Sequence, residues 1–219
     1  MNNIFDFING IIYINSLSYP DRLSNVTEQL KKINVDINDP RCKKIEALYP
    51  QKNQIPSGFN GRIGHYGCLY SHAMSYKYIE SLNNGYYLIL EDDIFIIDNF
   101  LMHFTKMIND IDNFFDIFYL YNIKNDTDPL KSYNSGLLKH KKAPKLTHAY
   151  IINSSFYLYK NYFQDIPYLL DHCNCRHHID IILREYIPFK YIYTSKTTII
   201  EQNRKKFKSH IKNSKRCIH

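Results

Sequence analysis

The 219-residue chain lacks the sequence features of membrane-spanning and secreted proteins. No apolar run reaches the roughly 18 residues that a membrane-spanning helix needs. The first residues show no basic start and no small-residue cleavage site, and Asp6, Asn9 and Gly10 interrupt their apolar stretch. The five cysteines are an odd and scattered set, which argues against a disulfide framework. We therefore expect a soluble, cytoplasmic protein with reduced thiols and no membrane span.

Tryptophan is also absent, and the abundance of Ile, Lys, Asn and Tyr is typical of the coding bias of an AT-rich genome. Acidic residues are absent from residues 204–219, which hold seven basic ones, so the formal net charge of +7 lies in this segment. A basic tail can hold nucleic acid, an anionic surface or a diphosphate, or it can simply be solvated. We expect one domain over residues 1–203, followed by this tail.

The remaining composition is that of an ordinary globular protein, with 44% hydrophobic and 22% charged residues. A β-branched run at 11–14 precedes Pro20, which favours a strand that leads into a helix. Residues 86–90 are continuously apolar, as expected of a central strand covered on both faces. Strands that alternate with helices predict an α/β fold whose ligands gather at the carboxyl ends of the strands.

Weaker patterns predict the remaining elements. Further strands are expected at 43–48, 115–121, 146–152, 190–193 and 197–200. Helices are expected at 67–82, 155–170 and 178–186. A further helix is expected to begin after Asp98, which would cap it. The polar, lysine-containing stretch 122–145 is interpreted as a mobile surface loop.

The triplet Glu91, Asp92 and Asp93 directly follows the apolar run 86–90. In extended backbone Glu91 and Asp93 share one face and Asp92 points the other way. Two oxygen ligands at a strand end can hold a divalent cation, which usually completes its coordination with water and substrate phosphates. A solvated turn or a helix entrance is the alternative interpretation.

A second cluster spans residues 64–72. Gly67 lets the backbone approach a ligand closely near the predicted start of a helix, where free N–H groups favour anions. Cys68 and His72 stand four residues apart on one helical face, which suits a catalytic dyad or simple packing. A third cluster, at 171–180, holds two cysteines and three histidines, but their spacing does not follow a zinc-binding pattern.

In this order, the segments resemble glycosyltransferase family 25, a group that includes lipopolysaccharide glycosyltransferases and collagen galactosyltransferase-like domains. The resemblance rests on residues 12–15 with 20–22, on Gly67-Cys68 with Ser71-His72, and on residues 88–93. Weaker similarities lie at 149–152, at Asp180 and at 200–202. The resemblance implies a GT-A-type, Rossmann-like α/β fold with a mostly parallel central sheet. It also implies a UDP-sugar donor, Mn²⁺ or Mg²⁺ as the metal, and an inverting transfer of a hexose to a hydroxyl acceptor in a glycan or a protein.

The resemblance assigns roles to individual residues. Ile14 and Asn15 border the uridine, with Arg22 near them, and Glu91 and Asp93 hold the metal. His210 in the tail reaches the metal or the diphosphate. Asp180 is the base that takes the acceptor proton, or a helix cap. The other expected contacts to the donor come from Gly67, Ser71, His72 and Asp92.

Two other classes of function stay open. Ser16, Leu17 and Tyr19 depart from the family's usual opening motif, which favours a transferase-like fold that only binds a nucleotide or a glycan. Nucleic-acid binding through the tail would use aromatic stacking. The tyrosines, however, mostly lie at core spacing and do not interleave with the basic residues of the tail.

Overall fold

The computed structural model describes residues 3–55, 59, 61–111, 114–122, 129–155 and 178–208. The strands are β1 (Gly10–Asn15), β2 (Cys42–Glu46), β3 (Tyr86–Glu91), β4 (Ile94–Ile96), β5 (Ile117–Tyr119), β6 (Lys131–Ser132), β7 (Leu137–His140), β8 (Ala149–Asn153), β9 (Ile192–Ser195) and β10 (Ile200–Gln202). The helices are α1 (Pro20–Lys31), α2 (Ile63–Glu80), α3 (Phe100–Asn109) and α6 (Ile179–Ile181), which continues as a π-helical turn over Ile182–Tyr186. Short 3₁₀ turns lie at Ile4–Asp6 and Lys52–Gln54.

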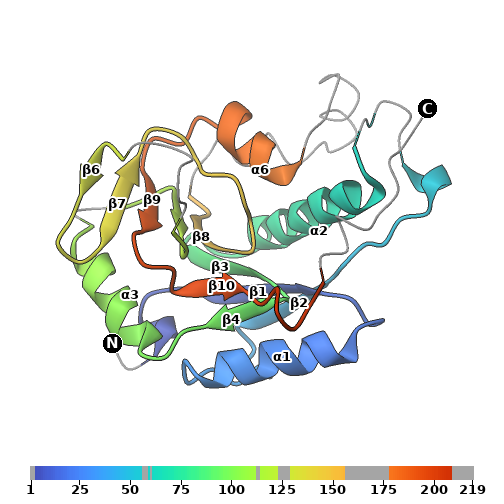
Figure 1. Ribbon diagram of the computed structural model, residues 1–219, viewed down its shortest axis with the longest axis horizontal. Coiled ribbons are helices and arrows are strands. Elements are labelled where there is room, and N and C mark those ends of the chain that lie inside the picture. The colour runs from blue at the N-terminus through green and yellow to red at the C-terminus, as the bar shows by residue number, and fades with distance from the viewer. Residues whose placement is uncertain are drawn as a thin grey trace.

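An eight-stranded sheet in the order β2-β1-β3-β8-β5-β9-β7-β6 forms the centre of the molecule (Figure 1). All strands except β8 and β7 run in the same direction, as the strand pairings show. A separate antiparallel pair, β4 with β10, lies beside the carboxyl end of β3. The expected α/β class is confirmed, and six of the eight strands of the central sheet run in one direction, as expected for a Rossmann-like arrangement.

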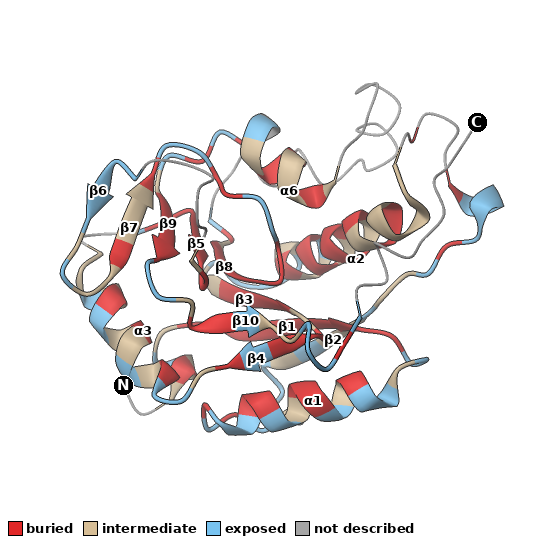
Figure 2. Cartoon of the chain, in the orientation of Figure 1, coloured by how far each residue is buried: buried red, intermediate tan, exposed pale blue. Residues whose placement is uncertain are grey.

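Apolar side chains cover both faces of the sheet. In β1, Ile12 and Ile14 point to one face and Ile11 and Tyr13 to the other, which is the alternation of a strand. The first face packs against α2 and α6, and the second packs against α1 and α3. Figure 2 shows the buried residues concentrated on the strands and on the sides of α1 and α2 that face them. This double cover explains why residues 86–90 form an uninterrupted apolar run.

Several local predictions are confirmed. Pro20 is the first residue of α1, where its missing N–H costs nothing because the first amides of a helix have no intrahelical partner. The helix expected at 67–82 begins four residues earlier, at Ile63, and ends at Glu80. Among the described residues, no helix combines the length and the apolar character needed to cross a membrane.

Two local predictions are wrong. The stretch 122–145 is not simply a loop, because β6 and β7 pair within it and extend the sheet past β9. The turn between them uses Gly136 at φ +88°, a conformation that glycine adopts without strain. Asp98 does not cap α3, since the capping position is taken by Asn99 at φ 61°. The helix expected at 155–170 lies, from residue 156 onward, outside the described residues.

Candidate active site

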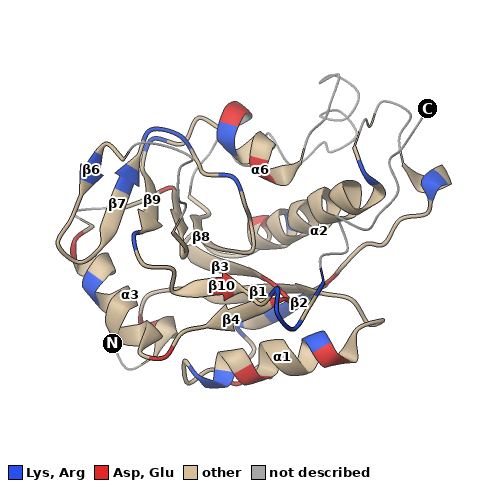
Figure 3. Cartoon of the chain, viewed as in Figure 1, with Lys and Arg blue, Asp and Glu red and all other residues tan. Residues whose placement is uncertain are grey.

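A cavity of about 330 Å³ lies where β1 and β3 end. These neighbouring strands are parallel, so their carboxyl ends meet at one edge of the sheet, where open α/β sheets bind ligands. The starts of α1 and α2, the segment 47–50 and the acidic triplet 91–93 form its walls, and Arg204 closes one side. The basic segment that follows β10 therefore meets the acidic end of β3 (Figure 3).

Both carboxylate oxygens of Asp92 accept hydrogen bonds from side chains of the protein. The Arg22 guanidinium donates to its Oδ1 at 2.6 Å, and the Asn15 amide donates to its Oδ2 at 3.0 Å. Asn25 also donates to the backbone carbonyls of Asp92 and Ile94. Burial raises the pKa of Asp92, and the charge of Arg22 opposes that shift. Asn15, Arg22 and Asp92, which the sequence assigned to the donor, thus form one buried cluster that holds the triplet in place.

Glu91 points into the cavity from the end of β3. Thr147 donates to its Oε1 at 3.2 Å, and Gln202 donates to its Oε2 at 3.5 Å. The ring nitrogen Nε2 of His72 lies 3.6 Å from Oε1. Burial opposes ionisation of this carboxyl, but its positively charged or protonatable neighbours outweigh burial and lower the pKa of Glu91. Glu91 is therefore a carboxylate at neutral pH.

Asp93 has one oxygen without a partner. Its Oδ2 lies 3.3 Å from the Arg204 guanidinium, whereas its buried Oδ1 makes no hydrogen bond within the described residues. Burial and the neighbouring charge of Glu91 raise the pKa of Asp93 to about 7. A buried oxygen of this kind is costly unless a proton, a cation or a hydrogen-bond donor satisfies it.

Gly67 and Ser71 line the cavity and also build its wall. A Cβ on Gly67 would lie 2.3 Å from the carbonyl oxygen of Leu48, so only glycine allows this contact between α2 and the segment 47–50. Ser71 Oγ accepts from the Leu48 amide at 3.0 Å and donates to the Gly67 carbonyl at 2.7 Å. Both residues therefore fix the shape of the cavity on this side.

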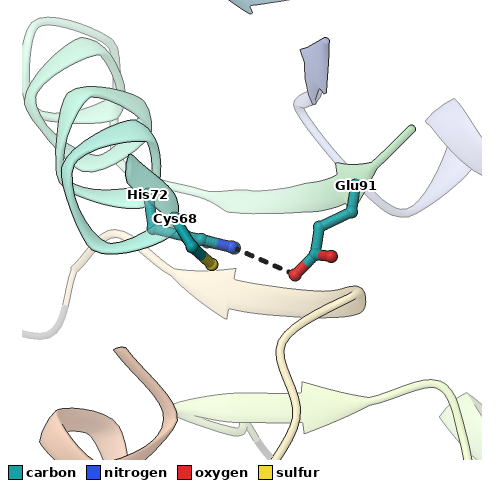
Figure 4. A group of neighbouring side chains, drawn as sticks. All are labelled: Cys68, His72 and Glu91. Carbon is teal, nitrogen blue, oxygen red and sulfur yellow. Dashed lines mark ion pairs between the residues drawn. The ribbon is translucent and has the colours of Figure 1, made fainter. Parts of the chain in front are cut away.

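His72 is buried below Gly67 and Ser71 on α2, with 1% of its surface exposed. Its Nδ1 forms a 2.9 Å hydrogen bond with the Tyr150 hydroxyl, and its Nε2 is directed at Glu91 (Figure 4). Cys68 lies one turn earlier and points the same way. Burial raises the pKa of the Cys68 thiol well above its ordinary value, so the sulfur is protonated at neutral pH. That state disfavours a nucleophilic Cys68–His72 dyad.

The other predicted residues differ in their position relative to this cavity. Asp180 lies in the first turn of α6, and its Oδ1 accepts from the amide of Ile181 at 2.9 Å. Its negative charge contributes to the raised pKa of Cys68. Ile14 does line the cavity, whereas Asn15 lies behind it on Asp92. His210 and most of the cysteine- and histidine-containing segment 171–180 lie outside the described residues.

Sequence reasoning did not assign Tyr19, Tyr49 or Arg204 to the cavity wall. Tyr19 and Tyr49 pair with ring centroids 5.6 Å apart, and Arg204 reaches Asp93 from the start of the tail. The absence of acidic residues after position 203 drew attention to the tail, but it did not predict that Arg204 pairs with the triplet. Loop positions such as Tyr49 follow no periodic pattern that a sequence could reveal.

The comparisons with known proteins agree with this geometry. A family model described as glycosyltransferase family 25 (LPS biosynthesis protein) matches residues 10–176, which is more than half of the chain. The matched range contains the triplet and every cavity residue except Arg204. The comparison with curated proteins finds no match.

Proposed function

The chain belongs to glycosyltransferase family 25, and from this we propose that it transfers a hexose from a UDP-sugar to a hydroxyl group of a glycan or protein acceptor, with metal dependence and inversion. The observation that carries the proposal is the cavity at the ends of β1 and β3, which is lined by three carboxyl groups, two guanidinium groups and two tyrosine rings. Such a set can hold a sugar nucleotide at its charged diphosphate and at its planar base.

The acidic triplet fits a hard divalent cation. Asp93 Oδ1 is buried and without a hydrogen-bond partner among the described residues, and Glu91 faces the same cavity. Oxygen ligands of this kind suit Mg²⁺ or Mn²⁺. When bound, the cation would neutralise the negative charge that develops on a leaving diphosphate. Asp92 is not a metal ligand in this proposal, because Arg22 and Asn15 already donate hydrogen bonds to both of its carboxylate oxygens.

Arg204 is the residue that we assign to the diphosphate. It is 43% exposed and pairs with Asp93 at 3.3 Å, so its guanidinium can rotate toward an anion in the cavity without leaving a buried site. A guanidinium binds phosphate oxygens in a bidentate manner. Tyr19 and Tyr49, beside Ile14, form the wall on which we place the uracil ring.

Inversion requires the acceptor hydroxyl to attack the anomeric carbon opposite the diphosphate while a base takes its proton. Asp180 remains our proposed base. Its position on α6, outside the residues that line the cavity, suits a group on the acceptor side rather than one that holds the donor. The proton, therefore, would pass from the acceptor oxygen to the Asp180 carboxylate as the new glycosidic bond forms.

Calorimetric titration of UDP into the full chain tests the donor site without knowledge of the sugar or the acceptor. We expect binding with Mn²⁺ and strong weakening with excess chelator, because two carboxylates repel a diphosphate that arrives without a cation. Equal binding in both conditions would contradict the metal role, and no binding in either would contradict the donor site.

A nucleotide-binding protein without turnover is the second candidate. One observation favours it: two of the three triplet carboxyls already pair with arginines of the same chain, Asp92 with Arg22 and Asp93 with Arg204. The release of UDP from UDP-glucose or UDP-galactose separates the two candidates. Metal-dependent release supports the transferase, and tight UDP binding with no release from any hexose donor supports the binder.

A further inference from the structure

Three side chains of different chemistry converge at the inner end of the cavity. Cys68 and His72 on α2 point toward Glu91 at the end of β3, as Figure 4 shows. One ligand atom from each, namely the thiol sulfur, the ring nitrogen and a carboxylate oxygen, lies within 4.8 Å of the others. The spacing of four residues places the two α2 side chains one turn apart on the same helical face.

This set differs from the oxygen ligands of the triplet. A thiolate, an imidazole and a carboxylate are ligands of Zn²⁺, whereas Mg²⁺ and Ca²⁺ take oxygen ligands. In a tetrahedral zinc site, ligand atoms are about 3.5 Å apart, given bond lengths near 2.0–2.3 Å. The 3.6 Å separation between His72 Nε2 and Glu91 Oε1 already has this value. The sulfur lies within 4.8 Å of both other ligand atoms, so the Cys68 side chain has to move toward them when zinc binds.

We propose that Cys68, His72 and Glu91 form a Zn²⁺ site that is distinct from the hard-cation site at Asp93. His72 carries the argument, because its Nε2 is directed into the cluster, is buried, and makes no hydrogen bond within the described part of the chain. On zinc binding, the Cys68 sulfur loses its proton to solvent and becomes the third ligand. All three residues line the cavity, so the fourth coordination position is open to water or to a substrate group.

Surrounding contacts hold the imidazole in the orientation that such a site needs. The Tyr150 hydroxyl binds Nδ1 of His72 at 2.9 Å, and the Tyr76 hydroxyl in turn contacts that of Tyr150. Partners of this kind fix the ring orientation of metal-binding histidines in proteins. Tyr150 is therefore a positioning residue for zinc. We expect Tyr150→Phe to lower the zinc affinity by about 10-fold to 100-fold while leaving all three ligands in place.

The sharing of Glu91 gives the zinc site a functional consequence. A zinc ion on Glu91 removes that carboxylate from the neighbouring hard-cation site and places a second positive charge beside it. Zinc should therefore inhibit the sugar transfer, and the inhibition should disappear in Cys68→Ser. This consequence rests on the proposed function, whereas zinc binding itself does not.

Cobalt absorption tests the site directly, because Co²⁺ replaces Zn²⁺ and a cysteine thiolate bound to it gives an intense near-ultraviolet band. We expect the reduced full chain to show this band and Zn²⁺ to abolish it. Cys68→Ser should lose the band. Cys42→Ser, which alters another partly exposed cysteine, and the double variant Cys173→Ser/Cys175→Ser should keep it.

The result that overturns the proposal is a band that persists in Cys68→Ser, or no band in the wild-type chain. A band lost only in Cys173→Ser/Cys175→Ser would assign the thiolate ligand to the segment 171–180 instead. Thermal unfolding serves as the check on folding: Cys68→Ser should melt near the wild-type temperature without zinc and lose the zinc-dependent increase. His72→Asn, whose amide can still reach Tyr150, should behave in the same way.

Failure of this proposal is distinguishable from failure of the proposed function. Asp93→Asn should lose the Mn²⁺-dependent binding of UDP and keep the cobalt band, because Asp93 supplies no ligand to the zinc site. Cys68→Ser should show the opposite pattern. Cobalt binding through Cys68 without any binding of UDP would support the zinc site and contradict the proposed UDP-sugar donor.

Discussion

At the scale of single residues, the three neighbouring carboxyls of the triplet have three different environments. Asp92 is neutralised by Arg22, Glu91 faces a histidine, a threonine and a glutamine, and Asp93 keeps one buried oxygen without a partner among the described residues. Only Glu91 belongs to β3, whereas Asp92 and Asp93 lie in the turn that leads to β4, so the turn and not the alternation of a strand sets the directions of these two side chains. Sequence alone can place the three acids at the strand end, but the partner of each acid comes from a distant segment.

Asp93→Asn tests the residue that we assign to the metal. The amide nitrogen cannot replace a carboxylate oxygen as an anionic ligand, so we expect metal-dependent UDP binding and turnover to be abolished while the fold is kept. Calorimetry and circular dichroism measure the two effects. Asp98→Asn, a change at an exposed acid outside the cavity, is the matched control and should leave both unchanged. Wild-type activity in Asp93→Asn would show that the metal role is wrongly assigned.

Arg22→Met tests the buried ion pair. Arg22 and Asp92 are 7% and 8% exposed, so removing the guanidinium leaves a buried carboxylate without its counterion. We expect a loss of about 3–5 kcal/mol in the free energy of unfolding, measured by urea denaturation. The double variant Arg22→Met/Asp92→Asn should recover part of the loss, because no buried charge is left unpaired.

The exposed pair Arg41–Asp39 supplies the control for that measurement. Arg41 is 47% exposed, and ion pairs on the surface contribute little to stability because solvent screens them. Arg41→Met should therefore change the unfolding free energy much less than Arg22→Met. Equal effects of the two substitutions would mean that the Arg22–Asp92 pair is not buried as described.

At the scale of elements, the periodicity of apolar residues predicted the helices and strands that pack in the core. It did not predict the β6–β7 hairpin, which depends on a turn. The helical spacing of Leu23, Val26 and Leu30 and the apolar run 86–90 exist because those residues pack on a two-sided core. The β6–β7 hairpin is mostly polar and lies at the sheet edge, so burial leaves little pattern in its sequence. Gly136, which makes its turn possible, is visible in the sequence, but only the φ of +88° shows its role.

The junction of α2 and α6 gives a pH prediction. The rings of His65 and His178 lie 3.6 Å apart, and burial together with the mutual repulsion of the protonated rings lowers the pKa of His65 from 6.5 to about 4. Between these values His65 binds more protons in the unfolded chain than in the folded one, so its contribution to stability rises with pH. We expect the contribution of this junction to stability to fall as the pH drops from about 6.5 to about 4.

His65→Gln removes one of the two titrating rings at this junction. The variant should therefore lose less stability than the wild type over the same pH range, measured by urea denaturation at a series of pH values. Histidine proton resonances followed by NMR give the folded-state titration of His65 independently. An unchanged pH profile in the variant, or an ordinary titration of His65 near neutral pH, would refute the lowered pKa.

At the scale of the whole molecule, the basic segment that begins at Arg204 contacts the domain formed by the preceding residues. The chain returns from β10 to the acidic triplet, where the Asn203 amide donates to the Asp93 carbonyl and Arg204 pairs with its side chain. Phe207 is buried, with its ring 5.1 Å from the Arg22 guanidinium, and the Lys208 carbonyl accepts from Arg22 at 3.0 Å. Arg204 therefore lines the cavity, and Phe207 and Lys208 pack against Arg22 beside it, so residues 204–208 are in contact with the preceding domain.

Two truncations separate the possible roles of the tail. Removal of residues 209–219 keeps Arg204 and Phe207 in place, whereas removal of 204–219 takes away the guanidinium beside Asp93 and the ring beside Arg22. If Arg204 binds the diphosphate, the longer truncation should weaken UDP binding at least tenfold, about 1.4 kcal/mol, and the shorter one should change it much less. Arg204→Met in the full chain should reproduce most of the loss, because it removes only the charge.

Nucleic-acid binding predicts a different pattern for the same truncations. Its affinity would depend on the sum of the basic residues, so both truncations would weaken binding to RNA or DNA in proportion to the charges removed, and added salt would weaken it further. UDP binding would then be unaffected by either change. Equal UDP affinity in the wild type and both truncations would therefore show that the tail does not contribute to the donor site. Loss of UDP binding only in the longer truncation and in Arg204→Met would support a contact between Arg204 and the diphosphate.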